Sequence, residues 1–124
     1  MSMFRREAWP SLRTCLLLWA CAIPACSTPA ANCPADLPTA CPADVPSFKA
    51  TIAPIVASHC TLCHSADGSQ SGQSFGTYDL VYASRSAVLD QIYACNMPPA
   101  GAPQLTLDER VTVLAWLVCG SPNN

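Results

Sequence analysis

Two cysteines and a histidine in the segment Cys60-Thr61-Leu62-Cys63-His64 have the C-x-x-C-H spacing that attaches a porphyrin covalently. One turn of chain separates the thiols, which suits them to join the two vinyl groups of a single haem. The imidazole of His64 follows directly, where it can bind the iron as the proximal ligand. The segment therefore predicts one covalent c-type haem, attached through Cys60 and Cys63 and ligated by His64.

Two other uses of this segment stay open. A thioredoxin-like dithiol also uses C-x-x-C, but it belongs in a βαβ unit, and the chain contains no such pattern. A structural zinc site needs four ligands. Only His59, Cys95 and Cys119 could complete one, and they have no second paired spacing.

The N-terminus has the pattern of an export signal. Residues 1–13 contain three arginines, and residues 14–25 are almost uncharged and apolar. The apolar run is too short to span a membrane, which takes about 20 residues. We therefore expect residues 1–25 to be a signal peptide, and the protein to be exported to a compartment that permits disulfides.

The end of this signal resembles a bacterial lipoprotein box. Ile23-Pro24-Ala25-Cys26 matches the pattern at its first, third and fourth places, while Pro24 stands where a small residue is usual. Cys21 is a competing site, and ordinary signal-peptidase cleavage near Cys26 is a third possibility. We expect lipidation of Cys26, which would hold the protein on a membrane surface, in the periplasm or at the outer membrane.

The cysteine count agrees with this division of the chain. Of nine cysteines, two leave with the signal, one takes the lipid and two take the haem. Three pairings are possible among the remaining four, which are Cys33, Cys41, Cys95 and Cys119. We expect Cys95 to pair with Cys119, since both stand at predicted helix ends, and Cys33 to pair with Cys41. Free thiols are the alternative.

Residues 26–46 are rich in proline, alanine and threonine, and they contain a short repeat, C-P-A-D-L-P at 33–38 and C-P-A-D-V-P at 41–46. Such a composition favours extended chain that buries no core, so this segment is predicted to be a disordered tether. From residue 26 onward, three basic and seven acidic side chains give a formal net charge of −4. Without a basic patch, nucleic acid is not an expected partner.

The part from residue 47 to 124 is predicted to be all-α. Apolar residues recur at helical spacing from Phe48 to His59, and Pro54 requires either a turn followed by a helix or a kinked helix. Residues 78–94 form one helix, or two short ones because the stripe is interrupted at 84–86. Residues 65–77 and 96–104 have loop compositions, and no segment alternates like a strand.

The last helix has the clearest signals. Thr106-Leu107-Asp108-Glu109 is a capping box, and Gly120 ends the helix. Its predicted core face consists of Leu107, Val111, Leu114 and Val118, widened by Trp116 and Leu117.

The order of these elements, from Phe48 to Gly120, resembles class I c-type cytochromes: helix, C-x-x-C-H, loop, helix, Met97-Pro98, and a last helix with Trp116. More narrowly, it looks like the small cytochrome c-like domains of bacterial exported proteins. The resemblance implies a helical domain packed around one covalent haem. It also implies that Trp116 lies near Phe48 or Ile52, and that the thioether of Met97 is the second axial ligand.

By this resemblance the protein is an electron-transfer protein with His/Met ligation and with redox proteins as partners. No acid/base pair or nucleophile constellation accompanies the motif, so neither an enzyme nor a small-molecule substrate is expected. One alternative is a haem-based sensor of small ligands, with an open iron site if Met97 does not bind. Another is a lipid-anchored structural module without haem. His59 is expected either on the surface or in contact with a residue that binds the iron, without binding the iron itself.

Overall fold

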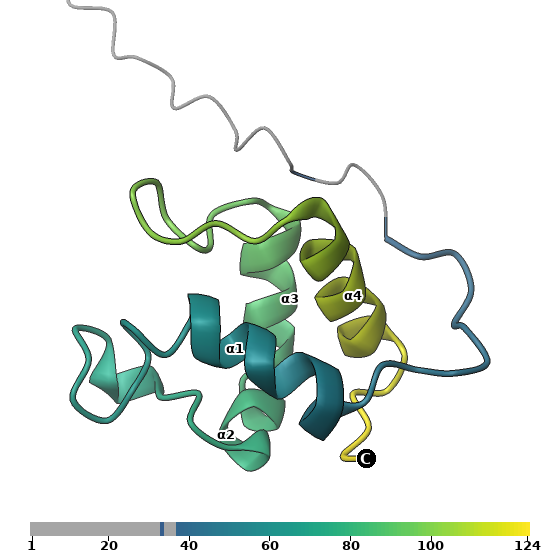
Figure 1. Ribbon diagram of the computed structural model, residues 1–124, viewed down its shortest axis with the longest axis horizontal. Coiled ribbons are helices and arrows are strands. Elements are labelled where there is room, and N and C mark those ends of the chain that lie inside the picture. Colours follow the sequence, from purple (N-terminus) through teal and green to yellow (C-terminus); the bar gives the residue numbers. More distant parts are fainter. Residues whose placement is uncertain (1–32, 34–36) are drawn as a thin grey trace, which may run out of the picture.

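The structure is a computed structural model, and it describes Cys33 and residues 37–124. Its elements are a π-helical turn η1 (Phe48–Ile52), helix α1 (Ala53–His59), a short 3₁₀ turn η2 (Ser71–Gln73), and helices α2 (Tyr78–Ala83), α3 (Arg85–Tyr93) and α4 (Leu107–Val118) (Figure 1). The described residues contain no strand, which confirms the all-α class for that part of the chain. The predicted signal peptide and Cys26 lie outside the described residues.

The first helical segment is a turn followed by a helix, which is one of the two predicted arrangements. The Ser47 hydroxyl accepts a hydrogen bond from the Ala50 amide at 3.2 Å and so starts the turn. Pro54 stands in the first turn of α1, a position where helices tolerate proline. Phe48 and Ile52 are buried, as the apolar spacing predicts.

The predicted helix over residues 78–94 is two helices. Thr77 caps α2 with its hydroxyl, which accepts from the Leu80 amide at 3.4 Å. The break falls at Ser84, whose backbone (φ −98°, ψ 5°) leaves the helical region. The interruption of the apolar stripe at 84–86 therefore marks the boundary between α2 and α3.

Helix α4 begins with the predicted capping box. The Thr106 hydroxyl accepts from the Glu109 amide at 3.2 Å, and the Glu109 carboxylate accepts from the Thr106 amide at 2.8 Å. Gly120 follows with a φ of +92°, a left-handed conformation that glycine adopts without strain.

The buried face of α4 differs from the predicted one. Leu107 and Val111 are 49% and 48% exposed, so they do not belong to the core. The helix is rotated so that a neighbouring stripe faces inward, and this stripe brings a charged residue into the interior. Its members are Arg110, Val113, Leu114, Trp116 and Leu117.

The centre of the core is an aromatic cluster around Trp116, which is fully buried. Its ring centroid lies 5.6 Å from that of Phe48, and Phe48 in turn meets Tyr78 edge-on at 5.0 Å. The cluster ties η1 and α2 to α4, and it includes the contact between Trp116 and Phe48 that the resemblance implies. No helix in the described residues is both long and apolar enough to cross a membrane.

Helices α3 and α4 pack side by side and run in opposite directions (Figure 1). Arg110, in the first turns of α4, is buried and donates from Nη1 to the carbonyl of Ile92, in the last turn of α3, at 2.9 Å. A cation at the C-terminal end of a helix offsets the partial negative charge there. Burial lowers the pKa of Arg110.

The disulfide pairing contradicts the prediction. Cys33 is bonded to Cys95, with Cα atoms 5.9 Å apart, and Cys41 is bonded to Cys119, with Cα atoms 5.5 Å apart. Because α3 and α4 are antiparallel, the cysteines that follow them lie at opposite ends of the pair. Helix α4 is about 18 Å long at 1.5 Å per residue, whereas bridged Cα atoms lie within about 7 Å. Cys95 therefore cannot reach Cys119.

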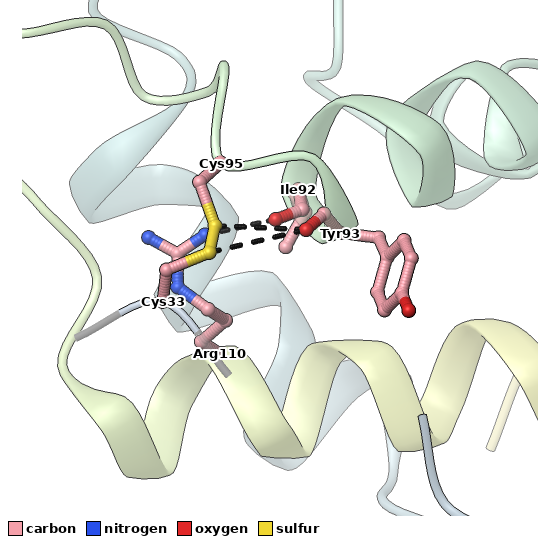
Figure 2. The surroundings of a disulfide bond; sticks show 5 residues. All are labelled: Cys33, Ile92, Tyr93, Cys95 and Arg110. Carbon is pink, nitrogen blue, oxygen red and sulfur yellow. Dashed lines mark hydrogen bonds between the residues drawn. A yellow bond between two sulfur atoms is a disulfide. The ribbon is translucent and has the colours of Figure 1, made fainter. Parts of the chain in front are cut away.

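Figure 2 shows the first of these bridges beside the guanidinium of Arg110. The backbone carbonyl groups of Ile92 and Tyr93 point toward the bridge and the guanidinium. The Cys95 sulfur lies 3.5 Å from the carbonyl oxygen of Tyr93. The bridge thus fastens Cys33 to the junction where α3 ends and α4 begins.

The segment predicted to be a tether is part of the domain from Leu37 onward. Leu37 and Val45 are half-buried and pack against the core. They occupy the same place in the two copies of the repeat, and each copy also supplies one disulfide cysteine. The repeat therefore fastens the N-terminal segment to the helices at two points, which its composition alone did not indicate.

Candidate functional site

One cavity brings the four predicted haem-binding residues together. It has a volume of about 330 Å³, within the range of small-molecule and cofactor pockets. Cys60, Cys63 and His64 line it from the turn that follows α1, and Met97 lines it from the loop after α3. The other walls are mainly apolar and include Phe75, Val88, Ile92, Pro98 and Leu105.

The attachment motif forms a single turn that continues α1. The Cys60 amide donates to the Val56 carbonyl at 2.9 Å, and the His64 amide donates to the Cys60 carbonyl at 2.9 Å. Both thiols of the motif are free, whereas the other four described cysteines are paired. The turn therefore presents two unpaired thiols and one imidazole to the same cavity.

The environment of Cys60 does not suit a redox-active dithiol. Burial raises the pKa of its thiol to about 11. Reactive C-x-x-C cysteines instead have a lowered pKa, because the thiolate is the nucleophile. The thioredoxin-like use of the motif is thus disfavoured at this position.

His64 is held in the orientation that a metal-binding histidine needs. Its Nδ1 lies 2.9 Å from the carbonyl oxygen of Gln73. A carbonyl only accepts, so Nδ1 carries the proton and Nε2 keeps its lone pair for a metal. The ring also stacks on Phe75, with centroids 4.6 Å apart and planes inclined by 25°.

The loop that follows the motif is fastened back onto it. The Gln70 amide donates to the Cys63 carbonyl at 2.9 Å, and the Phe75 amide donates to the His64 carbonyl at 2.8 Å. Gly68 lies so close to the Cys63 carbonyl that no Cβ fits there. Sequence reasoning assigned only a loop to residues 65–77. It missed Gln73 and Phe75, for which an aromatic residue in an otherwise small and polar loop was the available signal.

The loop that carries Met97 is fixed at its start. The amides of Asn96 and Met97 both donate to the Gln91 carbonyl, at 2.9 and 3.2 Å, and the Met97–Pro98 peptide is cis. Met97 is half-buried. Gln91, in the last turn of α3, thus fixes the backbone from which the Met97 side chain extends.

The side chain of Gln104 bonds to the backbone of the same loop. Its Nε2 lies 3.2, 2.8 and 3.0 Å from the carbonyl oxygens of Pro98, Pro99 and Ala102. Prolines have no N–H, so the loop has few backbone donors that could bond to its own carbonyl groups. Sequence reasoning missed Gln104, although a single amide side chain in a proline-rich loop is a usable signal for such a role.

The zinc interpretation finds no ligand set here. Among Cys33 and residues 37–124, no group of three or more His, Cys, Asp or Glu side chains is placed to hold a metal ion. His64 and Met97 are not such a group of zinc ligands, because a thioether is a soft ligand that suits haem iron or copper. The donors at the cavity, two free thiols, one oriented imidazole and one thioether, fit a covalent haem.

Comparisons with protein-family models, with curated proteins and with solved structures gave no match.

Proposed function

We propose that this protein is an electron carrier with one covalently attached c-type haem, ligated by His64 and Met97. The observation that carries the proposal is the shared cavity. Two free thiols and an imidazole in C-x-x-C-H spacing line the same apolar space as Met97, which follows His64 by 33 positions in the sequence.

Each of these residues has a distinct role in the proposal. Cys60 and Cys63 form the two thioether links, and the Gln73 carbonyl keeps the Nε2 of His64 free to bind iron. The bound haem supplies reversible one-electron chemistry. The thioether of Met97 favours a higher reduction potential than a second histidine would. Most of the cavity walls are apolar, which suits them to pack against a porphyrin ring.

The haem also explains how so small a domain holds a cavity of this size. A domain of about 80 residues has a limited hydrophobic core, and covalent or metal links commonly supplement it. Two disulfides serve that purpose here, and a haem would add a large apolar surface for the helices to pack on. The proposed cofactor is therefore structural as well as redox-active.

We expect protein expressed with a haem-maturation system to carry one haem per chain that survives denaturation. Intact mass and haem staining of a denaturing gel measure it. The double variant Cys60→Ser/Cys63→Ser should lose all covalent haem, because serine forms no thioether.

Ser58→Ala is the matched control, since this residue is exposed on α1, its hydroxyl donates to the Pro54 carbonyl of the same helix, and its loss should leave attachment intact. A parent chain that lacks the mass of a porphyrin would exclude the haem, and a non-haem structural module would then replace the carrier.

We further propose that the protein is exported and anchored to a membrane surface through a lipid on Cys26. Cys26 precedes Cys33 by seven positions, and Cys33 is bonded into the domain through Cys95. At most about 25 Å of extended chain would therefore separate lipid and domain. Such a short link would keep electron exchange close to the membrane, with redox proteins as partners.

Cys26→Ser is expected to move the protein from the membrane fraction to the soluble fraction, because the lipid-bearing sulfur is gone. Cys21→Ser is the control and should leave the protein on the membrane. If Cys26→Ser stays membrane-bound while Cys21→Ser does not, the anchor is at Cys21. If neither variant is released, lipidation is wrong.

A further inference from the structure

His59 links the end of α1 to the loop that carries Met97 and to the start of α4, which lie 44 and 50 positions away in the sequence. It is the last residue of α1, directly before Cys60, and its side chain is only 13% exposed. Its Nδ1 lies 3.1 Å from the Pro103 carbonyl oxygen, in the loop that carries Met97. Its Nε2 lies 3.3 Å from Oε1 of Glu109, in the first turn of α4.

Both ring nitrogens of His59 therefore face oxygen acceptors. A neutral imidazole has one N–H and one lone pair, so it can donate to only one of them, whereas the imidazolium donates to both. Glu109 stays an acceptor because its pKa is lowered, first by the hydrogen bond from the Thr106 amide and then by those from the Thr106 hydroxyl and from His59. The hydrogen bonds to Pro103 and to Glu109 can therefore both form only when the ring is protonated.

Loss of this proton would act on the loop and not on α4. A hydrogen bond to a carboxylate is stronger than one to a neutral carbonyl. A neutral ring would therefore keep its remaining N–H on Glu109 and turn a lone pair toward Pro103. The contact that fastens the loop bearing Met97 to the attachment helix would be lost.

We propose that His59 is a positioning residue for Met97, and that it couples binding of one proton to the reduction potential. This inference rests on the proposed haem function. A protonated His59 holds the loop and adds a positive charge at the cavity, and both effects favour the reduced iron. The potential is therefore expected to fall when the ring loses its proton.

Few other ionisable groups surround His59. The loop from Asn96 to Leu105 contains none, and α1 contains none besides His59. On α4, Glu109 contacts the ring, Asp108 is exposed on the first turn, and the Arg110 guanidinium donates to Ile92 instead. On the attachment turn, Cys60 and Cys63 would be thioethers and His64 an iron ligand. Glu109 is thus the charged protein partner of the ring.

The test measures the reduction potential of the haem-loaded parent from pH 5 to pH 8, together with hydrogen–deuterium exchange of the loop. His59→Gln should remove most of the pH-dependent change in potential and make exchange in the loop faster at the acidic end. Glu109→Gln should have a similar effect, because glutamine still serves a capping box but carries no charge. The double variant should add little to either single one.

Gln104→Leu is the matched control. It loosens the same loop by removing the contacts to Pro98, Pro99 and Ala102, but it removes no ionisable group. It should shift the potential by a similar amount at every pH and leave the slope intact. Parallel pH profiles for the parent, His59→Gln and Glu109→Gln would overturn the inference while leaving the haem function standing. A parent without haem would instead contradict the proposed function.

Discussion

Replacing Met97 by leucine is expected to abolish the weak red absorption that a thioether ligand gives to ferric haem, and to lower the reduction potential. Leucine has nearly the volume of methionine, so packing in the cavity is preserved and only the sulfur is lost. Axial ligands tune haem potentials over about 0.8 V, so we expect a fall on the order of 100 mV. Redox titration followed by optical spectroscopy measures it.

Two further substitutions at this position separate ligation from packing. Met97→Ala should resemble Met97→Leu in potential, and it should bind carbon monoxide more readily because space opens beside the iron. Met97→His should keep two axial ligands but give a lower potential than the parent. If Met97→Leu keeps the potential and spectrum of the parent, then Met97 only fills space, as methionine often does.

The parent spectrum decides between the carrier and the sensor. A parent that lacks the thioether absorption, and whose ferrous form binds carbon monoxide readily, has an open iron site. The haem-based sensor would then replace the electron carrier, and the loop contacts of Gln91 and Gln104 would have to serve another purpose. A parent with the absorption and little affinity for carbon monoxide supports the carrier.

Removal of the bridge between Cys41 and Cys119 is expected to cost about 4 kcal/mol of unfolding free energy in the chain-entropy model. The bridge joins residues 78 positions apart, so it removes much freedom from the unfolded chain. Small domains are stable by about 5–15 kcal/mol, so the loss is a large fraction of the total. The variant Cys41→Ala/Cys119→Ala should melt lower by about 15 °C or more.

Calorimetry of the haem-loaded protein tests this cost, and peptide mapping without reduction tests the connectivity. The control is the single variant Cys41→Ala, which also loses the bridge and should melt near the double variant. An unchanged melting temperature would show that the bridge contributes little. A peptide that joins Cys95 to Cys119 would contradict the antiparallel packing of α3 and α4.

Some features of this protein are determined by short stretches of sequence. The capping box at Thr106 and Glu109 requires only residues three positions apart, and Gly120 ends α4 through its own backbone freedom. Pro54 limits where α1 can begin, because proline lacks an N–H. The C-x-x-C-H spacing likewise places its thiols and imidazole on one turn. Each of these effects acts within about one helical turn, so the sequence alone was sufficient to predict these local features.

Other features depend on which elements pack together. The sequence could not show that α3 and α4 are antiparallel, and this arrangement separates Cys95 from Cys119 and gives both cysteines partners in the N-terminal segment. It could not show the rotation of α4 either, because Arg110 and Val111 are neighbours in the sequence. Which of them faces inward depends on the packing of the whole helix, and in the structure Arg110 is buried and donates to Ile92.

The support of the candidate site also required the tertiary structure. The Gln73 carbonyl orients His64, and the Pro103 carbonyl meets His59 across 44 positions of sequence. A backbone carbonyl has the same chemistry in every residue, so no residue type marks it in advance as a partner. The sequence determined which side chains are candidates for binding a haem, and only the packing of the loops decided which backbone groups hold those side chains in place.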